Sequence, residues 1–216
     1  MRQEEDDMLA DLRRRLNTFA DSSDEQAEES VVQHPSLFLA RISWRTWAFV
    51  LVAAALIAGA GVRFHNAGEA AVVAVYIAVL VACAATDLTS FRVPNAITYP
   101  ATLFALLAAA LMPHGDLRAS LVGGATAAGF MVVALIISRG AMGLGDVKLA
   151  IFAGLAVGWP LVGDTLLLMA LSGGAVAVVL LATGLRGRRD PIPYAPFISA
   201  ATIAVILWQG TAFARF

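Results

Sequence analysis

The sequence predicts an all-α fold, a polytopic membrane bundle of about seven transmembrane helices in which one N-terminal helix precedes a six-helix core. Hydrophobic residues make up 59% of the 216 positions and charged residues only 14%, a balance far from that of a soluble domain. Of the sixteen acidic residues, ten lie within the first 29 positions, so the apolar segments that follow are nearly free of negative charge. The chain also has no basic field that would bind nucleic acid.

Residues 1–40 form a polar tail that is predicted to lie in the cytosol. The tail lacks the apolar core of a signal peptide, so the start of the chain is expected to stay inside. Apolar residues at helical spacing beside Arg13, Arg14 and Arg15 fit a short amphipathic helix on the membrane surface or on a partner, and a disordered tail fits as well. We therefore divide the chain into this tail and a transmembrane domain, residues 41–216.

Seven apolar spans follow the tail, separated by brief polar or Gly- and Pro-containing loops. The spans cover residues 46–62, 70–87, 96–112, 119–138, 147–159, 162–185 and 195–214. The fifth is short, because the 14 residues from Asp146 to Trp159 would cover only about 21 Å of a hydrocarbon core about 30 Å thick. Either this helix continues past Pro160, or its start lies with Asp146 in a pocket below the membrane surface.

Basic residues near the span ends predict how the bundle is oriented. Under the seven-span topology one side carries eight of them and the other side three. The richer side is expected to be cytosolic, which places the N-terminus inside and the loops after the second, fourth and sixth spans in the cytosol. The inner group is Arg41, Arg45, Arg92, Arg139, Lys148, Arg186, Arg188 and Arg189, and the outer group is Arg63, Arg118 and Arg215.

Asp87 and Asp146 are the candidate catalytic residues. The second span ends at Asp87 and the fifth begins at Asp146, so this topology brings both to the cytosolic face although 59 positions separate them. An ionisable residue at the edge of a bilayer is costly to keep and therefore indicates function. Two close carboxylates cannot both ionise easily, so the pair should share one proton and act as acid and base. His65 and His114 are predicted on the outer side, and we expect no metal or other cofactor.

The glycine-rich run before Asp146 supplies further candidate site residues. Gly143 and Gly145 permit irregular backbone and let another backbone, such as an extended peptide, come close. A phosphate-binding loop is not favoured, because Lys148 is followed by leucine rather than by Ser or Thr. Lys148 turns away from the helical face of Asp146 and is given a supporting role only.

Two proline-containing segments complete the set of supporting residues. Pro94 and Asn95 predict a loop and then the start of the third span, just beyond Asp87. In the last inner loop three prolines, Pro193 and Pro196 among them, predict a rigid extended segment before the final span.

Together these segments resemble the type IV prepilin peptidase family, aspartic membrane peptidases of the broad Gly-x-Gly-Asp class. The resemblance runs from about Val72 to Ala201, and all three segments occur in order with two spans between the aspartates. The matching residues are Asp87 with Val93-Pro94-Asn95, then Gly143-Leu144-Gly145-Asp146-Val147-Lys148-Leu149, then Ile192-Pro193-Tyr194-Ala195-Pro196-Phe197.

The resemblance implies that Asp87 and Asp146 form a catalytic dyad that activates water without a cofactor. One carboxylate would take a proton from the water as it attacks the scissile carbonyl; the other, protonated, would polarise that carbonyl and later help to protonate the leaving amine. The implied substrate is a prepilin or pseudopilin in the bacterial inner membrane. The implied cut lies on the cytosolic side, between a short basic leader and a hydrophobic helix.

The chain departs from the larger members of this family. Those members carry an N-terminal cytosolic zinc-binding domain with paired Cys-x-x-Cys motifs, and some also methylate the new N-terminus. This chain has Cys83 as its single cysteine, so it looks like the compact form associated with Tad/Flp pilus systems, and methylation gains no support. The polar tail is the expected contact with pilus or secretion machinery.

Two other classes of function stay open. In a transporter, Asp87 and Asp146 would relay protons or cations through the bundle, but we find no internal repeat of the kind that well-known transporter architectures contain. A non-enzymatic subunit of a secretion machine would use the tail as its docking element. We favour the peptidase.

Overall fold

The computed structural model describes residues 44–64, 66–137, 143–184 and 193–214, and their regular secondary structure is helical, which confirms the all-α prediction. The helices are α3 (Trp44–Arg63), α4 (Ala67–Ser90), α5 (Asn95–Leu111), α6 (Leu117–Ile137), α7 (Leu144–Val157), α8 (Leu161–Ala182) and α9 (Ala195–Gln209). The chain divides into two units, residues 1–47 and 48–216, and the contacts described below lie within the second. The predicted tail helix lies outside the described residues, so the division at residue 40 stays a prediction.

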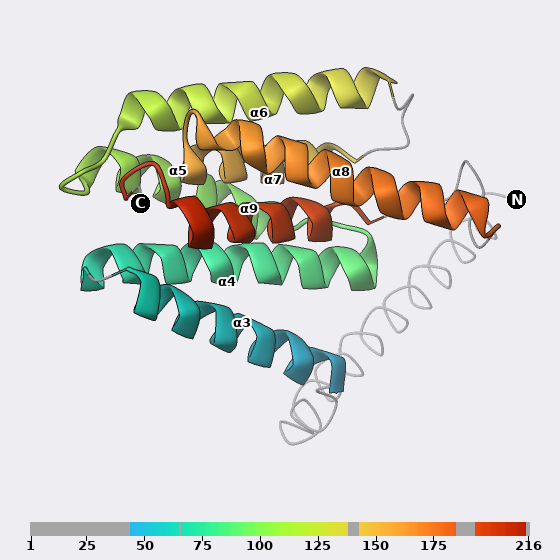
Figure 1. The fold of residues 1–216 in the computed structure, drawn as a ribbon, viewed down its shortest axis with the longest axis horizontal. Helices are drawn as coiled ribbons and strands as arrows, with labels where there is room; N and C mark the ends of the chain where they lie inside the picture. Colours follow the sequence, from blue (N-terminus) through green and yellow to red (C-terminus); the bar gives the residue numbers. More distant parts are fainter. Residues whose placement is uncertain (1–43, 65, 138–142, 185–192, 215–216) are drawn as a thin grey trace, which may run out of the picture. The chain divides into compact units, whose positions relative to one another are not determined.

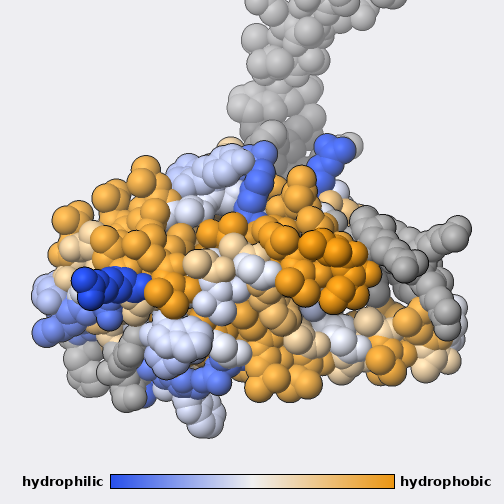
Figure 2. Space-filling view, turned by 90° about the horizontal axis from the view of Figure 1, so that it is seen from above, coloured by the Kyte–Doolittle hydropathy of each residue, from blue (hydrophilic) through white to orange (hydrophobic). Residues whose placement is uncertain are grey.

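Each of these helices coincides with one predicted span. Helices α4, α6 and α8 contain 24, 21 and 22 residues and are long and apolar enough to cross a membrane, since 20 residues of helix span about 30 Å. Helices α5 and α9 are shorter apolar helices. Large apolar side chains are exposed on each of these helices, and on α9 the exposed one is Trp208. Hydrophobic residues cover much of the face seen in Figure 2. The chain is a helical membrane protein, while the number of crossings and the side of the N-terminus stay predictions.

The predicted seventh span is too long at its C-terminal end. Helix α9 ends at Gln209 rather than at residue 214, because Gly210 adopts a φ of 107°, a conformation that suits glycine and breaks the helix. The chain then folds back onto the bundle. The N–H of Ala212 donates to the carbonyl of Ala156 at 3.1 Å, and the carbonyl of Ala212 accepts from the N–H of Asp116 at 3.2 Å.

Helix α7, the short fifth span, is a central element of the bundle. It packs against α5, α6, α8 and α9, and every residue from Phe152 to Val157 is buried. A helix that is apolar on all sides is expected to be enclosed by protein. The alternative in which this helix continues past Pro160 is wrong, because Gly158, with a φ of 71°, ends it after Val157. Its 14 residues need not match the bilayer thickness, since its neighbours rather than lipid surround it.

Glycines let the backbones of α6 and α7 come into close contact. A side chain at Gly123 in α6 would collide with the carbonyl oxygen of Gly154 in α7 and would lie 2.8 Å from Cα of Gly158. A side chain at Gly154 would lie 2.8 Å from Cβ of Ala127. Small residues at such positions are the usual means of close helix packing in membranes. These contacts fix α7, and the site at its N-terminus, against α6.

Helix α9 lies between α4 and α8 (Figure 1). The hydroxyl of Ser199 in α9 donates to the carbonyl of Leu80 in α4 at 2.9 Å, and both residues are buried. A hydroxyl that is satisfied by the neighbouring helix links the two helices at a fixed register. This register positions the N-terminus of α9 near the end of α4.

The glycine contact between α6 and α7 generates a stability prediction. Gly123→Ala should lower the free energy of unfolding by about 1–3 kcal/mol, because backbone atoms of α7 cannot move aside as a flexible side chain would. Gly129→Ala is the matched control in the same helix, since nothing lies within 4 Å of a Cβ built there. Thermal unfolding of the purified variants in detergent measures both; equal midpoints would contradict the predicted packing.

Candidate active site

Asp87 lies in the last turns of α4 with only 5% of its surface exposed. Its Oδ2 accepts a hydrogen bond from the N–H of Ala195 at 3.1 Å, and the backbone N–H of Tyr194 adds a second favourable interaction. Both donors belong to the N-terminus of α9, where free N–H groups and the helix dipole favour a carboxylate. The sequence placed Asp87 at the end of the span, whereas α4 continues to Ser90 and holds the carboxyl inside the protein.

The chain turns sharply after Asp87. Phe91 adopts the left-handed conformation, with a φ of 51°, and its N–H donates to the carbonyl of Asp87 at 2.9 Å. This geometry is costly for a bulky side chain and ends α4 at once. Pro94 then stands directly before α5, which begins at Asn95, so the predicted loop and helix start are confirmed.

Asp146 lies in the first turn of α7 and is 8% exposed. Gly143 precedes the helix in extended conformation; its carbonyl accepts from the N–H of Asp146 at 3.2 Å, and its own N–H interacts with the Asp146 carboxylate. The sequence offered a recessed start of this helix as one explanation of its short length. The burial of Asp146 agrees with that explanation.

Gly145 brings the two loops together. A Cβ at Gly145 would lie 3.0 Å from Cβ of Val93 and 3.6 Å from its backbone nitrogen. The glycine therefore lets the start of α7 pack directly on the loop that follows Asp87. This close approach is the physical reason for glycine at the second position of the Gly-x-Gly-Asp segment.

The contact of Gly145 with Val93 brings the start of α7, with Asp146, to the loop that follows Asp87. Both carboxylates are buried there, and the effect of each charge on the other is strong only at short range. The structure thus brings together two residues that are 59 positions apart in sequence. In the described part of the chain, no three His, Cys, Asp or Glu side chains gather as a set that could hold a metal ion.

Lys148 connects α7 to α5 beside this pair. Its ammonium group donates to Oδ1 of Asn95 at 3.0 Å and lies 4.9 Å from the centre of the Tyr99 ring. These contacts orient Lys148 and hold the start of α5 against α7. The supporting role of Lys148 and Asn95 in the site stays a prediction.

Tyr194 is a site residue that the sequence reasoning did not single out, although it stands inside the third motif. Burial raises the pKa of the Tyr194 phenol, and the nearby charge of Asp146 raises it further. The end of its ring fits against Gly173 of α8, where an added Cβ would lie 2.9 Å from Cε2 and 3.0 Å from the phenol oxygen. Only the packing of α8 on α9 reveals this neighbour.

The prolines of the third motif flank Tyr194. Pro193 is partly buried, and Pro196 is the second residue of α9, where the missing N–H of proline removes no helical hydrogen bond. Residues 185–192, with Arg186, Arg188 and Arg189, lie outside the described residues. So do His65 and Arg139.

An apolar groove of about 410 Å³ opens between α3, α4 and α9. It starts beside the site, at Leu88 and Pro196, and continues along α9 to Leu207. Its polar lining residue Ser199 already bonds to α4, so the groove offers an apolar surface. Such a surface suits an acyl chain or a hydrophobic peptide segment.

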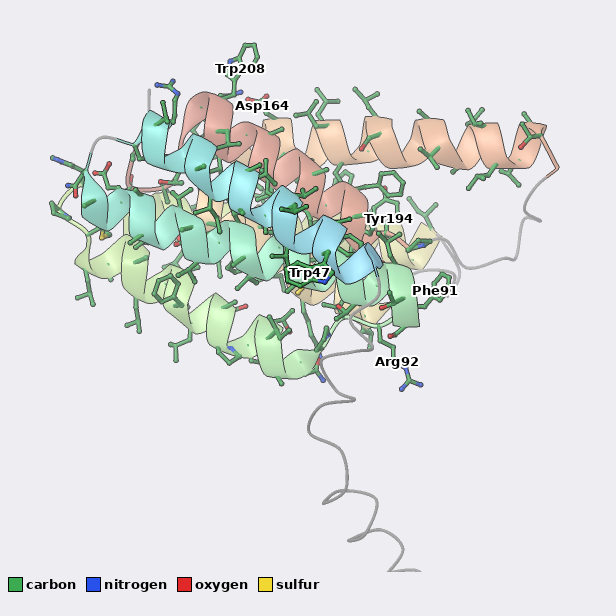
Figure 3. All side chains as sticks on the ribbon, turned by 90° about the horizontal axis from the view of Figure 1, so that it is seen from below. Trp47, Phe91, Arg92, Asp164, Tyr194 and Trp208 are labelled. Carbon is green, nitrogen blue, oxygen red and sulfur yellow. The ribbon has the colours of Figure 1, made fainter. Side chains whose placement is uncertain are left out.

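Residues labelled in Figure 3 lie at two opposite ends of the bundle. Tyr194, Phe91 and Arg92 lie at the end where α4 finishes and α9 begins, whereas Asp164 and Trp208 lie at the opposite end (Figure 3). Asp164 accepts a hydrogen bond from the side chain of Gln209 at 2.9 Å and takes no part in the site. The candidate site therefore occupies a single end of the helices.

Comparison with known proteins finds a family and several relatives that the chain resembles in sequence. The sequence profile of the type IV leader peptidase family matches residues 74–181. Over 170 residues the chain is 34% identical to the prepilin leader peptidase/N-methyltransferase of Bacillus subtilis, covering 78% of this chain and 68% of that protein. It is 30% identical over 170 residues to the protein of the same name in Burkholderia pseudomallei, covering 76% of this chain and 54% of that protein.

A third relative is the prepilin leader peptidase/N-methyltransferase of Aeromonas hydrophila, 29% identical over 137 residues, which are 60% of this chain and 47% of that protein. The chain thus spans about half to two thirds of the length of these relatives. No solved structure matches it significantly. The profile covers half of the chain and includes both Asp87 and Asp146, and the chain belongs to the type IV leader peptidase family.

Proposed function

We propose that the protein is a membrane aspartic endopeptidase that removes the leader peptide of a prepilin or pseudopilin, with Asp87 and Asp146 as its catalytic dyad. Membership of the leader peptidase family makes it a peptidase. The observation that supports the residue assignment is the packing of Gly145, next to Asp146, on Val93 in the loop after Asp87, with both carboxylates buried.

The proposed mechanism needs one water and one shared proton. The ionised carboxylate takes a proton from the water as the water oxygen bonds to the scissile carbonyl carbon. The protonated carboxyl donates a hydrogen bond to the carbonyl oxygen, and a proton then passes to the leaving amine as the C–N bond breaks. The donors from α9 to Asp87 support this scheme, because they stabilise one carboxylate of the pair in its charged form.

We propose that the substrate is cut at the cytosolic face of the bacterial inner membrane. The charge bias of the sequence supports this orientation, and the apolar groove beside the site supports a substrate with a hydrophobic segment next to the cut. The bilayer is then the second partner of the chain. The tail, residues 1–40, remains the proposed contact with pilus or secretion machinery.

The first prediction of the proposed function concerns the dyad. Asp87→Asn and Asp146→Asn should each lower the rate of leader removal from a co-expressed precursor by about 10²- to 10⁴-fold, because neither amide can exchange the proton that hydrolysis requires. Immunoblotting of membranes measures cleavage and insertion together. Asp164→Asn is the control, since this residue lies at the opposite end of the bundle. Normal processing by either dyad variant would refute the assignment.

The second prediction concerns the loop contact at Gly145. Gly145→Ala should slow cleavage by about 10- to 100-fold, because the methyl group separates α7 from the loop after Asp87 and misplaces the dyad. Adding Val93→Gly should restore much of the rate, because it removes the Cβ atom that the new methyl group would meet at 3.0 Å. Gly163→Ala, which adds its methyl group in open space, is the control. A fully active Gly145→Ala variant would contradict this role.

The third prediction concerns orientation. In a Cys83→Ala background, Ser90→Cys should react with a membrane-impermeant thiol reagent only from the cytosol, and Asn66→Cys and Asp116→Cys only from outside. Ser90 and Asn66 lie at opposite ends of α4 and are both exposed, so each position is the control for the other. Labelling of spheroplasts and of inverted vesicles distinguishes the sides. The reverse pattern would overturn the cytosolic site.

A further inference from the structure

We infer that the hydroxyl of Tyr194 is a third catalytic group of the site, which donates a hydrogen bond to the scissile carbonyl oxygen of the substrate. This inference rests on the proposed function, because it assigns a role within peptide hydrolysis. Neither the family profile nor the names of the relatives assign a role to this residue.

Tyr194 is linked to both members of the dyad. Its backbone N–H interacts with the carboxylate of Asp87, next to the 3.1 Å hydrogen bond that Ala195 donates to the same group. Burial raises the pKa of its phenol, and the charge of Asp146 raises it further, so the phenol lies within electrostatic range of Asp146. The backbone of Tyr194 therefore lies at one acid and its ring within range of the other.

Packing against neighbouring residues holds the ring of Tyr194 in place. Gly173 leaves the space that the end of the ring occupies, since an added Cβ would lie 2.9–3.0 Å from Cε2, Cζ and the phenol oxygen. Phe197 packs on the ring with centroids 5.8 Å apart. Next to Gly173, Gly174 faces open space. A donor that packing holds in advance needs little rearrangement when charge develops in the transition state.

The phenol proton is available for a substrate. No hydrogen bond joins the Tyr194 hydroxyl to another described residue, and the residue is only partly buried. Lys148, a cation of the second motif, already donates to Asn95. A neutral phenol is a good hydrogen-bond donor, and burial keeps it protonated.

In the inferred step every bond that forms is matched by a bond that breaks. The water oxygen bonds to the carbonyl carbon, and the π electron pair of the C=O bond moves onto the carbonyl oxygen, where the Tyr194 O–H stabilises the growing charge. When the C–N bond breaks, the C=O bond reforms and the amine takes a proton from the dyad. Tyr194 keeps its own proton throughout, so one water is consumed and two peptides are released.

The test is a kinetic comparison of Tyr194→Phe with the wild-type enzyme, using purified protein in detergent and a precursor with a hydrophobic helix. Phenylalanine keeps the ring against Gly173 and removes only the hydroxyl. We expect kcat to fall about 10²- to 10³-fold with KM nearly unchanged, as for the loss of one oxyanion donor. Tyr76→Phe is the matched control, because Tyr76 lies 11 positions before Asp87 in α4, about 17 Å along the helix.

A pair of adjacent glycines tests the same inference without touching the hydroxyl. Gly173→Ala should displace the ring and lower kcat, whereas Gly174→Ala in the same turn should leave kcat unchanged. If Tyr194→Phe does not fold, the two glycine variants test the role of the hydroxyl in its place. Equal kcat values for the two glycine variants would overturn the inference.

The outcomes separate this inference from the proposed function. Wild-type kcat in Tyr194→Phe, or a change in KM alone, would overturn the role of the hydroxyl while the dyad assignment stands. Undiminished cleavage by Asp87→Asn would instead refute the dyad, whatever Tyr194→Phe does. A purely structural role for Tyr194 predicts that phenylalanine is fully active.

Discussion

The hydrogen bond from the N–H of Ala195 to the carboxylate of Asp87 is the interaction on which the rest of the site depends. A buried carboxylate in a membrane helix needs donors, and α4 cannot supply them because its own N–H groups are used within the helix. The N-terminus of α9 supplies them. The same contact brings Tyr194 to the site, and the bond from Ser199 to Leu80 fixes the register of the two helices.

Asp146 reaches the site by a different means. Helix α7 is enclosed by its neighbours, and the missing side chain at Gly145 allows its first turn to touch Val93 in the loop after Asp87. One acid is therefore positioned by a helix N-terminus and the other by a close backbone contact. Both carboxylates are largely buried, which strengthens their interaction with each other.

Much of this arrangement could be predicted from sequence, because apolar runs and charge bias act locally along the chain. The spans, the loop at Pro94 and the meeting of Asp87 with Asp146 follow from these signals. The end of α9 could not be predicted, because Gly210 stops an apolar run that hydropathy alone continues. Tyr194 was missed because its neighbour Gly173 lies on another helix. A single sequence does not indicate that the missing side chain of this glycine leaves room for the ring.

Cross-linking measures directly whether residues 87 and 146 meet in the membrane. A Cys83→Ala protein carrying Asp87→Cys and Asp146→Cys, with a protease site added in the exposed loop at residues 113–116, is treated with a short bifunctional thiol reagent and then cut. We expect the two fragments to stay joined, whereas Asp87→Cys paired with Asp164→Cys should give separate fragments. Separate fragments from the first pair would show that residues 87 and 146 do not share one site.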